Sequence, residues 1–144
     1  MIYRTRDEKL MAMALRLAVK GLGETSPNPV VGCLLYKNGH IIAKDYHHKA
    51  GQPHAEVLVL RKAGVEASGS TMYVTLEPCS TYGRTPPCTE EIIKAKVRKV
   101  IIGTIDPNPK INGRGVQALK KAGIEVVTGV IKEECKKINV AYNK

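Results

Sequence analysis

Hydrophobic residues recur along the chain with two alternating spacings, one typical of helices and one typical of strands. Near the N-terminus they recur at helical spacing, and Thr5 with Glu8 matches a capping box, which predicts a helix from about Asp7 to Lys20. Residues 30–36 and 41–46 read as strands, and the Asn38-Gly39 pair between them favours a hairpin turn.

Helical and strand-like segments then alternate to the end of the chain. A helix is expected to start at Pro53 or His54 and to end at Gly64, where glycine commonly terminates helices. The further elements expected are a strand at 71–76, a helix at 89–96, a strand at 99–104, a helix at 115–122, a strand at 124–127 and a helical tail at 132–142. This order predicts an α/β protein with a mixed, largely parallel sheet covered by helices. Ligands of such sheets collect at the carboxyl ends of strands, where His54, Cys79 and Asp106 fall.

Composition is consistent with one globular domain over residues 1–144. Hydrophobic residues make up 43% of the chain, and because Phe and Trp are absent, aliphatic side chains must fill the core. No apolar run approaches the roughly 20 residues that span a bilayer. The N-terminal segment lacks a signal-peptide core, so we expect a cytoplasmic protein with no membrane partner. In that compartment, four cysteines indicate metal ligands or reduced thiols.

The net charge of +10 is concentrated in the second part of the chain. Residues 1–91 hold 11 Lys and Arg against 9 Asp and Glu, whereas residues 92–144 hold 12 against 4. Such a basic segment favours an anionic substrate, a nucleic acid or an acidic partner. A solvated, lysine-rich surface without a partner explains the charge equally well.

Three short pieces of sequence carry the candidate chemistry: His54-Ala55-Glu56, Pro78-Cys79 and Cys88. One His and two Cys are a complete ligand set for a Zn²⁺ ion with an open fourth position, which is typical of catalytic zinc. His-x-Glu followed by Pro-Cys and a second Cys is the pattern of zinc nucleobase deaminases, in which Glu is the proton carrier. Glu56 is therefore expected to be the general acid and base of a hydrolytic deamination.

Two details of spacing test this interpretation. Residues i and i+2 lie on nearly opposite sides of an ideal helix, so His54 and Glu56 must occupy a helix start, where side chains can still converge. Cys79 and Cys88 are separated by eight residues, instead of two in the commonest deaminase pattern, so the intervening segment must loop out. Two buried, inert cysteines remain the alternative, although the prolines between them favour a loop over a core strand. Cys33 and Cys135 are interpreted as core residues.

At this point the sequence resembles a known family. The matching stretches, in order, are 25–32 (TSPNPVVG), 54–56 (HAE), 75–80 (TLEPCS), 83–88 (GRTPPC) and 106–109 (DPNP). They resemble the deaminase domain of the bacterial riboflavin-biosynthesis bifunctional deaminase/reductase, over about residues 5–142. The resemblance implies a cytidine-deaminase-like, three-layer α/β/α sandwich with a mixed five-stranded sheet. It also implies deamination of 2,5-diamino-6-(5-phosphoribosylamino)pyrimidin-4(3H)-one, a small phosphorylated pyrimidine.

Carried over position by position, the resemblance assigns roles to named residues. It assigns zinc binding to His54, Cys79 and Cys88, acid/base catalysis to Glu56, and substrate binding to Asn28, His47, Arg84, Asp106 and Asn108. Arg84 suits a phosphate, and Asn28 a pyrimidine edge. The family usually has His where this chain has Thr81. The family's chain also continues into a reductase domain, and these 144 residues contain no dinucleotide-binding stretch. They are therefore either a free-standing deaminase, after which a separate reductase would act, or one domain excised from a longer chain.

Two other functions stay open from the residues. A tRNA adenosine deaminase would suit the basic second part, but the close cysteine pair and the stacking residues Phe and Trp are missing, which disfavours nucleic acid. A non-catalytic, zinc-stabilised binding module would need a fourth protein ligand, for which His47 or His48 has no spacing argument. Related deaminases associate through helices, so a homo-oligomer is expected.

Overall fold

A computed structural model of the chain describes residues 2–83 and 85–140. Helices and strands follow in the order predicted, with one additional 3₁₀ turn. The helices are α1 (Arg6–Val19), α2 (Ala55–Ala63), α3 (Cys88–Lys94), α4 (Arg114–Lys121) and α5 (Lys132–Lys137), with the 3₁₀ turn η1 at Gly64–Ala67. The strands are β1 (Gly32–Lys37), β2 (His40–Tyr46), β3 (Thr71–Leu76), β4 (Lys99–Thr104) and β5 (Glu125–Thr128).

The strands form a five-stranded sheet, within the part of the chain described, in the order β2-β1-β3-β4-β5. β1 pairs antiparallel with both β2 and β3, whereas the β3–β4 and β4–β5 pairs are parallel. The expected mixed sheet is confirmed. It is less parallel than expected because β1 lies between β2 and β3, so the hairpin contributes two antiparallel pairings.

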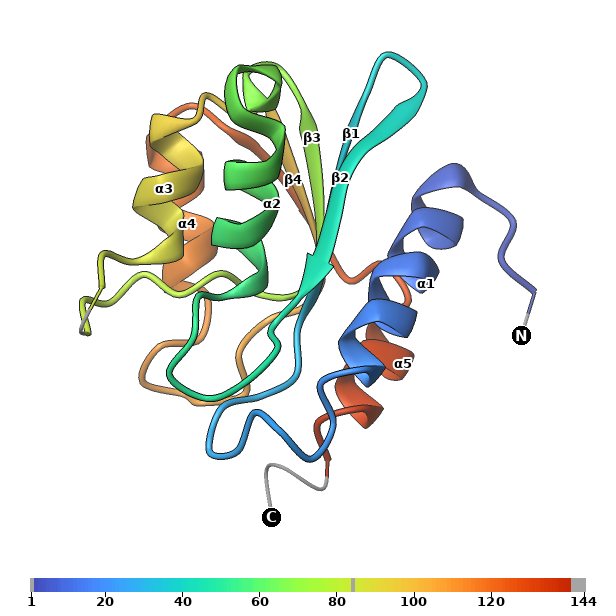
Figure 1. The fold of residues 1–144 in the computed structure, drawn as a ribbon, viewed down its shortest axis with the longest axis vertical. Coiled ribbons are helices and arrows are strands. Elements are labelled where there is room, and N and C mark those ends of the chain that lie inside the picture. The colour runs from blue at the N-terminus through green and yellow to red at the C-terminus, as the bar shows by residue number, and fades with distance from the viewer. Residues whose placement is uncertain (1, 84, 141–144) are drawn as a thin grey trace.

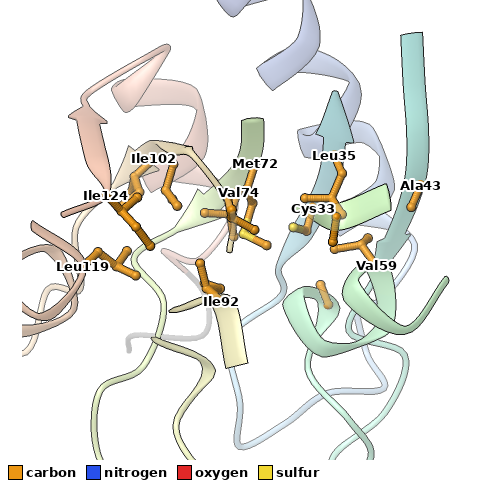
Figure 2. Packing of buried hydrophobic residues seen from close by; sticks show 14 residues of the cluster. Cys33, Leu35, Ala43, Val59, Met72, Val74, Ile92, Ile102, Leu119 and Ile124 are labelled. Carbon is orange, nitrogen blue, oxygen red and sulfur yellow. The ribbon is translucent and has the colours of Figure 1, made fainter. Parts of the chain in front are cut away.

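Helices cover both faces of the sheet, as a three-layer α/β/α sandwich requires (Figure 1). Helices α2, α3 and α4 lie on one face, and α1 and α5 lie on the other. On the first face, Val59 of α2, Ile92 of α3 and Leu119 of α4 pack onto β-strand residues such as Val74 (Figure 2). Leu10, Met11 and Ala14 of α1 form the second core with Leu34, Tyr73, Ile101 and Cys135. Aliphatic side chains and one buried tyrosine therefore fill the interior, as expected from a chain without Phe or Trp.

Helix ends agree with the local sequence signals. Thr5 caps α1 in a complete capping box with Glu8, and Gly64 ends α2 with a positive φ of 56°. At Gly32, a Cβ would lie 1.8 Å from the carbonyl oxygen of Ala14, so the absence of a side chain lets α1 contact β1 directly. Among the helices described, none is both long and apolar enough to cross a membrane.

Candidate metal centre and active site

The candidate site lies at the edge of the sheet where β3 and β4 end and where the antiparallel β1 begins. Helix α2 starts at the same edge, and His54 is its N-cap with an extended backbone, φ −69° and ψ 160°. Glu56 is the second residue of the helix. Because His54 precedes the helical turn, its side chain and that of Glu56 do not diverge as two helical residues at i and i+2 would.

Three ligand atoms come together at this edge. One donor atom each from His54, Cys79 and Cys88 lies within 4.8 Å of the others. Nδ1 of His54 is 3.3 Å from Sγ of Cys88 and 4.0 Å from Sγ of Cys79. Tetrahedral zinc, with bonds of about 2.0 Å to nitrogen and about 2.3 Å to sulfur, would hold such atoms about 3.5–3.8 Å apart. The donor set therefore fits a zinc ion in both chemistry and spacing.

The second cysteine is placed by helix α3 and not by the loop in which the sequence placed it. Cys88 is the first residue of α3, and its backbone N–H donates to Sγ of Cys79 at 3.3 Å. Hydrogen bonding to Cys88 lowers the pKa of the Cys79 thiol, and the same pairing together with burial raises that of Cys88. The pair thus readily holds one thiolate, the form that binds metal. Cys33 and Cys135 are buried in the core, as expected.

Glu56 is a buried carboxylate beside the three candidate ligands. Its side chain is 4% exposed, and its Oε1 has no hydrogen-bond partner among the described residues. Burial raises the pKa of Glu56 to about 7. A buried polar atom without a partner is costly, so a native protein retains one mainly where a ligand or water meets it. Glu56 is therefore oriented for a group that enters the site.

His47 connects two of the predicted site residues. The residue is 2% exposed, and its ring packs edge-on against the ring of His54, with centroids 5.2 Å apart. Nδ1 of His47 lies 3.2 Å from the carbonyl oxygen of Pro53, which can only accept, so this nitrogen carries the proton. Nε2 consequently accepts from Nδ2 of Asn28 at 3.2 Å. This pairing leaves Oδ1 of Asn28 available to a ligand.

Asp106 and Asn108 lie on the wall of a cavity of about 450 Å³. The cavity is lined by Pro29, Leu76, Asp106, Pro107, Asn108, Ile111 and Asn139. One oxygen of Asp106 accepts from the backbone of Asn108, and Oδ1 of Asn108 accepts from that of Lys110, so both side chains also shape the turn. The cavity has the volume of a small-molecule site, but its lining includes neither the candidate zinc ligands nor Glu56. Arg84 lies outside the described residues, and Thr81 is exposed at the edge of the site.

Two residues that the sequence reading did not select also hold this region together. Asn139 is buried, and its side-chain amide pairs with both the N–H and the C=O of Val30. Glu77 is buried directly before Pro78-Cys79. Nothing in the sequence marks Asn139, because its partner lies 109 residues away. Glu77 could have been noticed as an acidic residue at the end of an otherwise apolar strand.

Comparisons with known proteins agree with this geometry. A riboflavin biosynthesis protein RibD from Aquifex aeolicus is 52% identical over 138 residues, which are 96% of this chain and 39% of that protein. A protein from Buchnera aphidicola, named diaminohydroxyphosphoribosylamino-pyrimidine deaminase, is 45% identical over 139 residues, 96% of this chain and 95% of that protein. The solved structure of Acinetobacter baumannii RibD matches with a TM-score of 0.91 at 52% identity, covering 94% of this chain and 38% of that one.

The chain spans well under half the length of the RibD proteins that it matches. It spans nearly the whole of the Buchnera protein. A family model described as the cytidine and deoxycytidylate deaminase zinc-binding region matches residues 4–104, which include all three candidate ligands and Glu56. Both the fold and the expected use of zinc are thereby confirmed, and the chain belongs to the cytidine and deoxycytidylate deaminase family of zinc-binding proteins.

Proposed function

We propose that this chain catalyses the hydrolytic deamination of 2,5-diamino-6-(5-phosphoribosylamino)pyrimidin-4(3H)-one, releasing ammonia. The observation that carries the proposal is the buried Oε1 of Glu56, which has no hydrogen-bond partner within residues 2–83 and 85–140 and lies beside the cluster of His54, Cys79 and Cys88. A structural zinc site has four protein ligands and no open position, so a buried carboxylate beside it would have no water or substrate to meet. The substrate is assigned from the RibD proteins and from the Buchnera deaminase, whose length this chain nearly matches.

In this proposal His54, Cys79 and Cys88 hold the zinc ion. When bound, zinc supplies the Lewis acidity that makes water a nucleophile at neutral pH. Glu56 accepts one proton from the water that adds to carbon 2 and delivers it to the ring nitrogen. It then accepts the second proton from the new hydroxyl on carbon 2 and delivers it to the leaving amine. A carbon–oxygen bond forms, the carbon–nitrogen bond to the 2-amino group breaks, and ammonia leaves. Such a proton relay contributes about 10²–10⁴ in rate.

The remaining predicted site residues bind the substrate in this proposal, except His47, which positions Asn28. Oδ1 of Asn28 accepts from an N–H on the pyrimidine edge, and His47 keeps the amide in the orientation that presents this oxygen. His47 would then act through Asn28, since its own ring nitrogens both face protein atoms. Oδ2 of Asp106 and Nδ2 of Asn108 make no hydrogen bond to a described residue and are assigned to the ribose. Arg84 is assigned to the phosphate from its residue type alone.

The expectations about partners remain predictions. Residues 1–144 are proposed to act as one deaminase domain whose product is taken by a reductase, either a separate protein or a further domain as in the bifunctional family. A homo-oligomer is likewise expected from related deaminases.

The experiment is a substrate comparison with zinc-loaded protein of measured metal content. Ammonia release is followed with the freshly prepared diaminopyrimidine ribotide, with deoxycytidylate and with a tRNA transcript, and each product is identified by mass spectrometry. We expect ammonia from the ribotide, in step with replacement of one amino group by oxygen. Inosine formation in tRNA without turnover of the ribotide would contradict the proposal.

A further inference from the structure

Glu77 is a charged residue buried in the wall of the site, and the deamination chemistry does not use it. Its side chain is 6% exposed, and it lies two residues before the candidate ligand Cys79. Both of its carboxylate oxygens are occupied by backbone donors. Oε1 accepts from the N–H of Asp106 at 3.1 Å and of Gly113 at 3.0 Å, and Oε2 accepts from the N–H of Val116 at 3.0 Å.

All three donors belong to a single segment that joins β4 to the first turn of α4. This helix has no capping side chain of its own, because its N-cap is Gly113, with φ 80°, and its first turn contains no acidic residue. Glu77 therefore provides the cap from a different part of the chain. The same carboxylate also fixes Asp106, seven residues earlier, so it holds both ends of the intervening loop.

Close packing strengthens this connection. A Cβ at Gly115 would lie 2.2 Å from the carbonyl oxygen of Pro78 and 3.0 Å from Cγ of Glu77. The start of α4 thus contacts the backbone that carries Cys79 with no room for another atom. The backbone N–H of Glu77 also donates to the carbonyl oxygen of Thr104 at 2.9 Å, which continues the β3–β4 pairing to the site.

The loop between the two fixed ends forms much of the cavity wall. Asp106, Pro107, Asn108 and Ile111 all line the cavity of about 450 Å³. Oδ1 of Asp106 in turn accepts from the N–H of Asn108 at 2.9 Å, so the position of Asp106 determines that of Asn108. One carboxylate therefore links the segment that holds the metal ligand to the residues assigned to the ribose.

We propose that Glu77 is a positioning residue that holds loop 105–113 in register with Cys79 and thereby determines the affinity for the sugar part of the substrate. The identity of that substrate rests on the proposed function. The alternative is a purely structural cap, whose loss would lower stability without a selective effect on substrate binding. A positioning role predicts a raised KM, whereas a purely structural cap predicts a lowered Tm with KM unchanged.

The test compares Glu77→Gln and Glu77→Ala with wild type, each with measured zinc content. Gln retains one acceptor oxygen, which can serve the donors at Asp106 and Gly113 or the donor at Val116, whereas Ala retains none. We expect full zinc occupancy, a KM for the ribotide raised about tenfold in the Gln variant and further in the Ala variant, and a smaller change in kcat. Thr5→Ala, which removes the cap of α1 far from the cavity, is the matched control and should lower Tm with no change in KM.

A double mutant separates positioning from general destabilisation. If Glu77 acts through the loop, its Gln substitution should raise KM less in an Asn108→Ala background than in wild type, because one of the two contacts that it positions is already gone. Independent, multiplicative effects on KM, or a lowered Tm with KM unchanged, would overturn the proposal.

Hydrogen exchange tests the same connection without any substrate. Amides of residues 105–116 should exchange faster in zinc-loaded Glu77→Gln than in wild type, while α1 exchanges at the wild-type rate. Unchanged exchange over 105–116 would overturn the role of Glu77. Faster exchange together with an inactive wild type would instead leave Glu77 as the residue that holds the loop and contradict the assigned substrate.

Discussion

At the scale of single residues, the four cysteines fall into two chemically different pairs. Cys79 and Cys88 adjoin His54 at the open edge of the sheet, whereas Cys33 and Cys135 are buried among core side chains. Cys79→Ala should abolish stoichiometric zinc binding, because two protein ligands hold the ion too weakly. Cys135→Ala, the matched control, should retain one zinc per chain by elemental analysis. Equal zinc content in the two variants would contradict the ligand assignment.

A second residue-scale prediction concerns acid stability. Asp45 is buried and bonds to Nζ of Lys62 at 2.8 Å and to Nε2 of His48 at 2.6 Å. Burial opposes ionisation, but the hydrogen bonds from Lys62, His48 and the Tyr46 backbone prevail and lower the pKa of Asp45. A lowered folded-state pKa stabilises the fold above the unfolded value, about 3.9, and this stabilisation disappears as pH falls through the folded value.

Asp45→Asn should therefore be less stable than wild type in urea unfolding at pH 7, and the difference should shrink below about pH 4. A difference that is the same at both pH values would show that lost packing, and not the charge, accounts for it.

At the scale of elements, the side chain of Asn139 holds the segment after α5 to Val30, two residues before β1. Asn139 accepts from the N–H of Val30 at 3.0 Å and donates to its carbonyl oxygen at 3.3 Å, in a buried setting. Asn139→Ala leaves both backbone groups without these partners and should cost about 2 kcal/mol in the free energy of unfolding. Asn112→Ala, at an exposed position, is the control and should change stability by less than about 0.5 kcal/mol. Equal stability of the two variants would contradict the account.

Elements governed by local patterns could be predicted well from the sequence. Strands β3 and β4 have the predicted bounds, and the α1 capping box is confirmed, because periodicity and caps depend on neighbouring residues. Features that depend on long-range contacts could not be predicted. The insertion of β1 between β2 and β3, and the bonds made by Glu77 and Asn139, join segments far apart in sequence. The start of α3 at Cys88 was missed because Thr89 is itself a common residue at a helix start. The N-cap of α3 is Pro87, which makes no side-chain hydrogen bond and so gives no capping signal in the sequence.

The candidate site shows the same division. Residue types and spacing were sufficient to predict that His54, Cys79 and Cys88 lie together, because imidazole and thiolate groups are the usual ligands of zinc. The orientation of the Asn28 side-chain amide could not be predicted from the sequence, because it depends on which nitrogen of the buried His47 carries the proton.

At the scale of the whole molecule, zinc should add a bond between three segments that already lie together in the fold, and so stabilise the folded state. The candidate ligands come from the start of α2, the segment after β3 and the start of α3. A ligand that binds only the folded state stabilises it by mass action, by about 4 kcal/mol at a thousand times its Kd. A strong chelator should therefore lower Tm by on the order of 10 °C in wild type. It should leave the Tm of Cys79→Ala unchanged, and an equal shift in both proteins would contradict a folded-state zinc site at these residues.

The catalytic role of Glu56 is tested by measuring zinc content and ammonia release on the same preparations of wild type, Glu56→Gln and the exposed control Glu133→Gln. The amide at position 56 keeps the shape of the side chain but cannot accept the proton from water. We expect one zinc per chain in all three proteins, wild-type turnover of the ribotide in Glu133→Gln, and turnover lowered by about 10²-fold or more in Glu56→Gln. Wild-type turnover in zinc-loaded Glu56→Gln would contradict the catalytic role of Glu56.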